Sequence, residues 1–197
     1  MAVRNSDVRY GAVAMVFHWV IAALLLCNIA LGAYMADLPR GDPGKFLLFQ
    51  THKSIGLTVL ILSAVRIVWR LINPVPPLPP GMGRGLTFGA RVSHTLLYIF
   101  ILVVPLAGWA MVSASPLGTP TLYFGLFEWP HMAVFADLPR TTKIAYKETF
   151  QDTHAILAYS ALALIAVHAL AALYHQFMLR DDVLKRMLPG TRVGTSQ

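Results

Sequence analysis

The sequence predicts an all-α integral membrane protein, a single domain over residues 1–197 built as a bundle of four transmembrane helices. Composition is the first observation behind this prediction, because 56% of the residues are hydrophobic, 13% are charged and the mean hydropathy is +0.60, values unlike those of ordinary soluble domains. The second is four apolar stretches, each long enough to cross roughly 30 Å of hydrocarbon. They are Ala12–Met35, Leu47–Ile72, Val92–Ala114 and Thr153–Leu179. The third observation is that every stretch contains a histidine.

Each stretch meets the requirements of a transmembrane helix. The first has no charged residue, is longer than a signal-peptide core and is followed by no small-residue cleavage site. The third and fourth are also free of charge, and the second contains only Lys53, Arg66 and Arg70. Pro105 should kink the third helix, which a bundle tolerates because neighbouring helices satisfy the freed carbonyl.

The connections between the stretches are rich in helix-breaking residues. After the second stretch, five prolines between Asn73 and Gly81 form a polyproline-like strap that cannot continue a helix. The longest connection, 115–152, is interrupted by proline and glycine and contains many aromatic residues, which suit the membrane interface. Part of it is expected to form a short helix along the outer surface.

The distribution of Lys and Arg predicts that both termini are cytoplasmic. The two tails and the 73–91 connection, with the two arginines of the second stretch, hold ten of the 16 basic residues. The 36–46 and 115–152 connections, with Lys53, hold the other six, whereas the nine acidic residues are divided three against six. Short cytoplasmic loops carry the positive excess in membrane proteins. The net charge of +7 is mostly this bias and requires no nucleic-acid partner.

Two histidines of the fourth stretch, His154 and His168, share one helix face. Their fourteen-residue separation corresponds to about 1400°, within roughly 40° of whole turns, and to about 21 Å along the axis. A helix that crosses a bilayer therefore offers one imidazole near each surface. Two planar groups, one in each leaflet, require this arrangement; the alternative is two isolated polar residues buried in a bundle.

The other intramembrane histidines fall at the same two depths. His18 and His94 open the first and third stretches on the cytoplasmic side, where His168 also lies. His52 opens the second stretch on the outer side, at the level of His154. Because ionisable groups inside a membrane are uncommon and usually functional, five histidines at two depths indicate two ligand sites.

Paired imidazoles at two levels indicate two haems. Iron with two axial histidines has no open position, which suits electron transfer rather than oxygen binding. The chain has no Cys-x-x-Cys-His sequence, so the haems are expected to be b-type and non-covalent, and the single Cys27 excludes an intramolecular disulfide and a thiolate cluster. Zinc requires three or four converging ligands, and no acidic residue occurs inside any stretch. Copper bound by imidazoles remains an alternative.

Arginines and glycines support the same interpretation. Arg66 and Arg70 follow His52 by fourteen and eighteen residues, close to the same helix face, and their guanidinium groups suit haem propionates. The alternative is that they snorkel to lipid headgroups. Gly32 and Gly108 lie fourteen residues after the cytoplasmic-side histidines of their helices. Each places a missing side chain at the level of the outer site, although small residues also favour plain helix packing.

The assignment of the haem ligands starts from the fourth stretch. The fourth stretch supplies one ligand at each level, so each haem needs a partner histidine from another helix. At the outer level, the partner available to His154 is His52. At the inner level, either His18 or His94 could pair with His168.

Four ordered motifs cover nearly the whole chain. The first two are Arg9-Tyr10 to His18-Trp19, and His52-Lys53-Ser54-Ile55-Gly56 through Arg66 and Arg70 to the proline-rich strap. The last two are His94-Thr95-Leu96-Leu97-Tyr98 with Pro105-Leu106-Ala107-Gly108-Trp109, and His154 to His168-Ala169-Leu170-Ala171-Ala172-Leu173-Tyr174-His175. This ordered set resembles the bacterial cytochrome b561 family, in particular members described as superoxide oxidases. The wider group includes cytochrome b subunits of formate dehydrogenases and hydrogenases.

The resemblance implies that the first and second helices each share a haem with the fourth. Carried over, it implies His18 with His168 at the inner haem iron and His52 with His154 at the outer haem iron. His94 then lies beside the inner haem, in its second shell or near a propionate. The resemblance also implies a multi-pass protein of the bacterial inner membrane that oxidises superoxide at the outer face and reduces ubiquinone.

Candidate residues for the donor and acceptor ends lie near the two sites. Lys53, next to His52, is the candidate for attracting an anionic donor, although the acidic residues of the outer connections mean that any attraction has to be local. His175 is the candidate hydrogen-bond and proton partner of the quinone, with an interfacial histidine facing headgroups as the alternative. His131 is interpreted as structural, and Arg91 stands where relatives often have a histidine, so no histidine role is transferred to it.

Two other functions remain open from the sequence. The first is a membrane anchor and electron-transfer subunit of a larger dehydrogenase or hydrogenase, for which a periplasmic redox protein would be the partner. The second is a haemless structural four-helix protein, which a reduced-minus-oxidised spectrum without a b-type band would establish. For a stand-alone protein, the expected partners are membrane lipid, quinone and superoxide.

Overall fold

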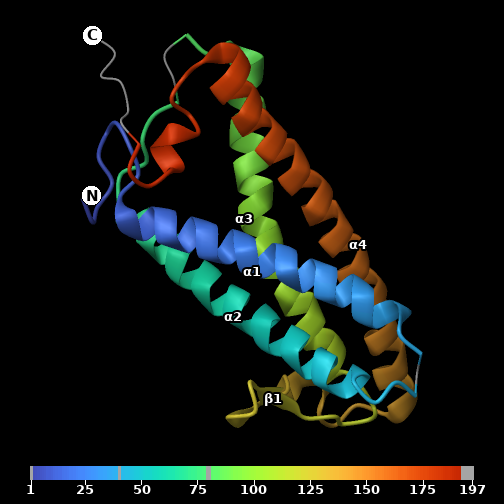
Figure 1. Ribbon diagram of the computed structural model, residues 1–197. Helices are drawn as coiled ribbons and strands as arrows, with labels where there is room; N and C mark the ends of the chain where they lie inside the picture. The colour runs from blue at the N-terminus through green and yellow to red at the C-terminus, as the bar shows by residue number, and fades with distance from the viewer. Residues whose placement is uncertain (1, 40, 79–80, 192–197) are drawn as a thin grey trace. The chain divides into compact units, whose positions relative to one another are not determined.

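The computed structural model describes residues 2–39, 41–78 and 81–191. Its long helices are α1 (Ala12–Asp37), α2 (Lys45–Leu71), α3 (Arg84–Ser113) and α4 (Arg140–Tyr174), which continues as a π-helical turn, η2 (His175–Leu179) (Figure 1). All four are long and apolar enough to cross a membrane. This confirms the predicted all-helical fold with four membrane spans.

Two helices begin at least eight residues before the predicted apolar stretches. α3 begins at Arg84 rather than Val92, and α4 begins at Arg140 rather than Thr153. The additional turns of α4 contain charged residues, which fall outside an apolar stretch but are compatible with a helix. Hydropathy therefore detects only the apolar part of each helix, and the helix itself extends into the polar residues before it.

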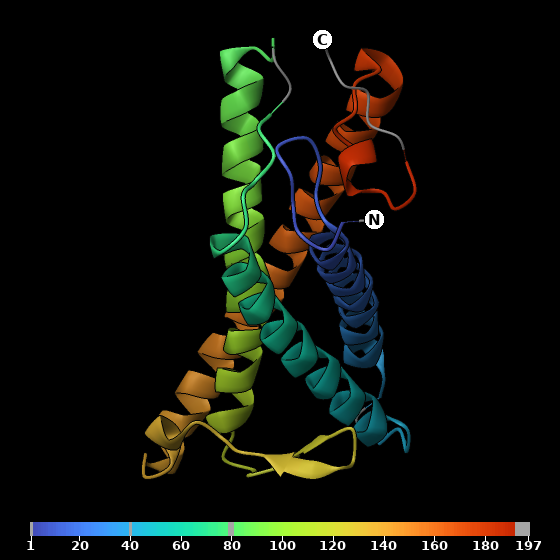
Figure 2. The ribbon, with the colours of Figure 1, turned by 90° about the vertical axis from the view of Figure 1, so that its left-hand side faces the viewer.

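The segment between α3 and α4 forms a short β-hairpin (Figures 1 and 2). β1 (Thr121–Tyr123) pairs antiparallel with β2 (Phe127–Trp129), and the turn includes Gly125 in the left-handed conformation that glycine adopts at little cost, with φ of 74°. A single 3₁₀ turn, η1 (Ala133–Phe135), follows. The helix expected in this connection is therefore limited to η1 and to the early start of α4.

One polar face of α2 fixes the hairpin in place. Side chains one turn apart on the first half of α2 each bond to a residue of the 122–124 segment. The pairs are Gln50 Oε1 with the Leu122 N–H (3.0 Å), Ser54 Oγ with the Phe124 N–H (2.9 Å) and Thr58 Oγ1 with the Tyr123 hydroxyl (3.0 Å). Gln50 and Ser54 are buried, so these bonds are shielded from water and tie the hairpin to the turns of α2 that carry His52.

The chain divides into two compact units, and every long helix contributes to both. The first unit comprises Met1–Ala22, Leu62–Ile99 and Ala163–Gln197. The second comprises Ala23–Ile61 and Phe100–Leu162.

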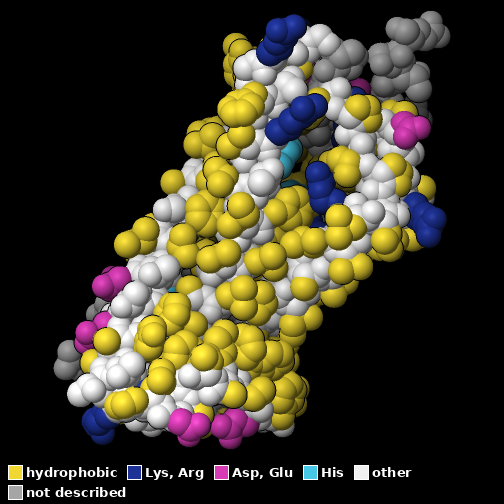
Figure 3. Space-filling model, turned by 180° about the vertical axis from the view of Figure 1, so that it is seen from behind, with side chains coloured by type: hydrophobic (Ala, Val, Ile, Leu, Met, Phe, Trp, Pro, Cys, Tyr) yellow, Lys and Arg dark blue, Asp and Glu magenta, His cyan; other side chains and the backbone are white. Residues whose placement is uncertain are grey.

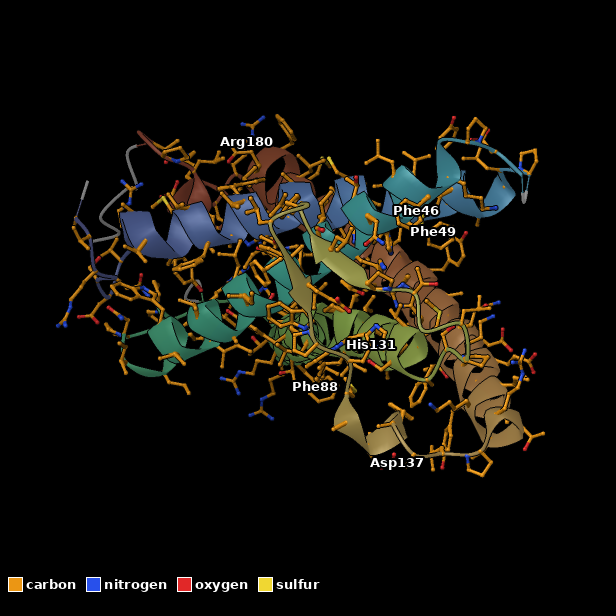
Figure 4. The ribbon with its side chains drawn as sticks, turned by 90° about the horizontal axis from the view of Figure 1, so that it is seen from below. Phe46, Phe49, Phe88, His131, Asp137 and Arg180 are labelled. Carbon is orange, nitrogen blue, oxygen red and sulfur yellow. The ribbon has the colours of Figure 1, made fainter. Side chains whose placement is uncertain are left out.

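In the second unit, an aromatic cluster explains why α4 starts early. Phe135 is buried with Ala110 of α3 and with Ala114, the residue after that helix. Its ring meets those of Tyr146 and Phe150 edge-on at 5.7 and 5.9 Å between ring centres, an arrangement that aromatic pairs prefer. Figure 4, seen from the hairpin side, labels His131 in the segment after β2, and Phe46 and Phe49 on the first turns of α2.

In the first unit, the C-terminal segment is tied to the start of α1. The side chains of Arg9 and Trp19 donate to carbonyls of this segment, namely those of Leu188 (3.1 Å), Thr191 (2.8 Å) and Met187 (2.8 Å). Of the proline-rich strap predicted over 73–81, residues 79–80 lie outside the described part of the chain.

Large apolar side chains cover much of the helix surface, as the face in Figure 3 shows. Val16, Leu71, Ile156 and Leu170 are each more than 60% exposed. Soluble monomers rarely expose contiguous apolar surface of this extent. In a bilayer, the same side chains face lipid.

Candidate functional site

Two histidines of the second unit, His52 of α2 and His154 of α4, lie close to each other. Their ring centres are 6.0 Å apart and the ring planes are nearly perpendicular, at 85°. The sequence placed both at the outer level, and the structure brings them together. We call these two residues the glycine-cradled pair, because a glycine of a neighbouring helix lies against each ring.

The ring of His52 is held by α1. Its Nδ1 lies 3.1 Å from the carbonyl oxygen of Asn28. One turn further along α1, a Cβ added to Gly32 would lie only 2.9 Å from His52 Cε1. The absence of a side chain at Gly32 therefore makes the space that the imidazole occupies, while the carbonyl fixes its rotation.

The ring of His154 is held by α3 in the same way. Its Nδ1 lies 2.9 Å from the carbonyl oxygen of Val104, and a Cβ on Gly108, one turn later, would lie 3.0 Å from His154 Cε1. Carbonyl and glycine are thus four residues apart on both helices. In each case the Nδ1–H donates to a carbonyl, which leaves the Nε2 lone pair available to a metal.

A cavity of about 570 Å³ opens beside the glycine-cradled pair, and both histidines line it. This volume lies within the usual range for cofactor sites. Its walls are mainly apolar, and its polar lining includes Lys53 and Lys147. The Nζ of Lys53 donates to the Pro120 carbonyl at 2.8 Å, and that of Lys147 donates to Gln151 at 2.5 Å.

Three histidines of the first unit, His18, His94 and His168, form a second group, which we call the arginine-side trio. The ring of His168 of α4 lies 6.3 Å from that of His18 of α1 and 5.3 Å from that of His94 of α3, measured between ring centres. The sequence placed all three at the inner level, and the structure brings them together. Both alternatives for the partner of His168 are therefore within reach.

The arginines predicted near the inner site lie in the same unit as the trio. An Nη of Arg66 lies 3.2 Å from Nδ1 of His18. Because a guanidinium only donates hydrogen bonds, Nδ1 of His18 is the acceptor here. Both Arg66 and Arg70 also stack on the ring of Tyr98, with the guanidinium carbon 5.3 and 5.1 Å from the ring centre.

His175 begins the π-helical turn at the end of α4. Its Nδ1 lies 2.5 Å from a carboxylate oxygen of Asp181, whose other oxygen accepts the N–H of Val183 at 3.0 Å. The chain reverses between the two residues because Arg180 adopts a left-handed conformation, with φ of 54°. Asp181 thus orients His175, as carboxylates orient functional histidines elsewhere.

Sequence reasoning missed several partners of these histidines. The backbone carbonyls of Asn28 and Val104 have no signature in a sequence. Asp181 lies six residues after His175, a spacing that faces away on a regular helix. Tyr98 was visible only as part of a motif, although its spacing of four residues from His94 could have placed it on the same helix face.

The two histidine groups suit a metal that is already held by other ligands of a cofactor. Among the described residues, no group of three or more His, Cys, Asp or Glu side chains is arranged to hold a metal ion. Pairs of imidazoles from different helices would instead suit the iron of a haem, which brings four nitrogen ligands of its own. Fold and site together define a four-span membrane protein with opposed histidine rings between its helices, a class that includes the b-type cytochromes.

Comparison with known proteins identifies the family. The family described as prokaryotic cytochrome b561 matches residues 9–190. "Cytochrome b561 homolog 2" of Escherichia coli is 32% identical over 95% of this chain and 95% of its own length. "Probable superoxide oxidase CybB" of Yersinia pestis is 28% identical, and "Cytochrome b562" of Cereibacter sphaeroides is 30% identical, each over 93% of this chain and 98% of the relative.

The chain belongs to the prokaryotic cytochrome b561 family. It is therefore a multi-pass protein of the bacterial inner membrane, an oxidoreductase that binds b-type haem and transfers electrons. The family resemblance read from the motifs is confirmed.

Proposed function

We propose that the chain is a stand-alone di-haem protein that oxidises superoxide at its outer face and reduces ubiquinone. The observation that carries the proposal is the close approach of histidine rings in both units, with ring centres 6.0 Å apart for His52 and His154 and 6.3 Å apart for His18 and His168. The haems supply one-electron acceptor and donor chemistry when bound. The protein supplies the ligands, their orientation and the surrounding charges.

The ring spacing supports this choice of ligands. Two imidazoles that held one metal ion between them by bonds of about 2 Å would have ring centres roughly 6 Å apart. The glycine-cradled pair and the His18–His168 pair have this separation. The His94–His168 distance of 5.3 Å is shorter. His94 is therefore proposed as a neighbour of the haem rather than an iron ligand.

Arg66 and Arg70 are proposed to bind the propionates of the haem between His18 and His168. Arg66 already contacts His18, and neither arginine forms an ion pair with a carboxylate of the described residues. If His18 held iron through Nε2, its proton would lie on Nδ1, and Arg66 would have to turn from Nδ1 to another acceptor. A propionate is such an acceptor.

The donor end is proposed at the cavity beside the glycine-cradled pair. Lys45, Lys53 and Lys147 line it together with one carboxylate, that of Asp42. This local cationic excess would attract a small anion such as superoxide, which the charge counts of the whole outer segments do not predict. The name of the Yersinia pestis relative adds support for superoxide as the donor.

The acceptor end is proposed near His175. Because Asp181 accepts a bond from Nδ1–H, a proton taken up at Nε2 would give an imidazolium that the carboxylate stabilises. The Nε2–H could then hydrogen-bond a quinone oxygen and pass the proton to it. The overall reaction balances as two superoxide anions, one quinone and two protons giving two molecules of oxygen and one quinol. α4 supplies a histidine to each haem site, so it is the common wall of the electron path. The charge bias predicts that the termini, and with them His175, lie on the cytoplasmic side.

The alternative function, an electron-transfer subunit of a larger complex, has one structural observation in its favour. Leu117, Leu126 and Val134 in the segment around the hairpin are 79%, 78% and 73% exposed. Apolar side chains outside the helices can form a docking surface for a redox partner.

Quinone reduction by the purified, partner-free protein tests the proposal and separates it from the alternative. With enzymatically generated superoxide as donor, the wild-type protein should form quinol, and His154→Ala should not. Inactivity of a fully haem-loaded wild-type protein, together with co-purification of an iron–sulfur protein from membranes, would favour the subunit function instead.

A further inference from the structure

Tyr98 of α3 lies against two arginines of α2. The guanidinium carbons of Arg66 and Arg70 are 5.3 and 5.1 Å from the centre of its ring. Both distances are within the roughly 6 Å over which a cation is attracted to an aromatic face. One tyrosine ring therefore contacts two cations at once.

The two arginines need such a contact because they repel each other. They are four residues apart on α2 and so share one face, where like charges destabilise a helix. Neither α2 nor α3 contains an acidic residue, and the ion pairs among the described residues are His175 with Asp181 and Lys185 with Asp182. Within the described part of the chain, the ring of Tyr98 thus takes the place of a carboxylate.

The contact also decides where the positive charges lie. Arginines in a membrane span normally extend towards the headgroups, where water solvates them. An Nη of Arg66 instead lies 3.2 Å from Nδ1 of His18, a histidine of the same unit. An aromatic face attracts a guanidinium without neutralising it, so the charge remains available to act on a neighbouring group.

We propose that Tyr98 is a positioning residue that holds Arg66 and Arg70 beside the His18–His168 site, where their charge raises the reduction potential of the haem bound there. The inference rests on the proposed haem at that site. Reduction adds an electron, which nearby cations stabilise in a medium of low dielectric constant. Release of the arginines towards water therefore lowers the potential and makes this haem a weaker electron acceptor.

A redox titration of the purified holoprotein, followed in the visible bands, tests the proposal. Tyr98→Leu removes the aromatic face. At matched haem content, the midpoint potential of one haem should fall by at least about 59 mV, which is a tenfold change in the equilibrium constant of its one-electron reduction. Tyr98→Phe retains the face and should stay within about 20 mV, or roughly twofold. Tyr159→Leu, at an exposed tyrosine of α4 in the second unit, is the matched control and should leave both potentials unchanged.

Arg70→Gln provides an independent variant if Tyr98→Leu fails to accumulate. It removes one of the two charges and should lower the same potential, and Tyr98→Leu should then add less in the Arg70→Gln background than in the wild type. Unchanged potentials in Arg70→Gln, or an equal drop in Tyr98→Phe and Tyr98→Leu, would overturn the proposal. A wild-type protein with a single haem would instead contradict the proposed function, whatever the variants do.

Discussion

The two histidine groups are prepared for ligation in different ways. In the glycine-cradled pair, each Nδ1 faces a backbone carbonyl and each ring lies against a glycine. In the arginine-side trio, Nδ1 of His18 faces the guanidinium of Arg66, and His168 is approached by two other imidazoles. Under the proposed haem ligation, the glycine-cradled pair already has ring and proton positions that suit a metal, whereas His18 would have to move a proton and Arg66 would have to turn away. We therefore expect the glycine-cradled pair to be a rigid site and the arginine-side trio to be an adaptable one.

The largest difference between the sites should appear when an axial ligand of the glycine-cradled pair is removed. His154→Ala leaves His52 without an opposing ring, so the variant should lose one haem per chain and retain the other. The haem-to-protein ratio and the reduced-minus-oxidised spectrum measure this loss. His131→Ala, at the loop histidine after β2, is the control and should retain both haems. Retention of both by His154→Ala would refute the pairing.

In the arginine-side trio, the same experiment should discriminate between two candidate ligands. His18→Ala should lose a haem because the His18–His168 separation of 6.3 Å suits axial ligation. His94→Ala should retain both haems and at most shift a spectrum. The reverse result, with haem lost from His94→Ala alone, would assign the iron ligand to His94.

The glycines of the rigid site should tolerate substitution poorly. A methyl group on Gly108 would lie 3.0 Å from His154 Cε1, so Gly108→Ala should cost about 1–3 kcal/mol through overpacking and should lower the thermal midpoint of the holoprotein. Gly89→Ala on the same helix is the matched control, since nothing lies within 4 Å of the added carbon. It should be neutral or more stable by up to about 1 kcal/mol. Equal midpoints for the two variants would argue against the cradle.

The smallest effect is expected at the donor end. Lys53→Gln removes one cation from the cavity lining and should slow the reaction with superoxide by less than about tenfold, mainly at low ionic strength. Lys143→Gln, whose amine donates to the carbonyl of Ala136, should leave the rate unchanged. Stopped-flow measurements over a range of salt concentrations compare the two, and an equal response of both variants would remove Lys53 from the approach path.

The sequence was sufficient for the spans and for the grouping of the histidines. Membrane helices have a long apolar signature, and 100° per residue relates His154 to His168 and His52 to Arg66 without any tertiary information. The spacing of Gly32 and Gly108 from the histidines of their own helices also predicted their position correctly, because the two glycines lie against His52 and His154.

The remaining features depend on contacts that no local pattern encodes. The β-hairpin has two three-residue strands, too short for an alternating pattern, and it is held by side chains of α2 about seventy residues earlier. Asp181 reaches His175 because of a π-helical turn and a left-handed Arg180. The early start of α4 follows from the packing of Phe135 on Tyr146 and Phe150, which hydropathy does not detect.

The haem content of the purified, full-length protein tests the central claim most directly. If α4 is the common wall of two haem sites, the pyridine haemochrome assay should give two haem b per chain. One haem per chain in a fully loaded preparation would contradict the account, because the glycine-cradled pair and the arginine-side trio could not then both be haem sites.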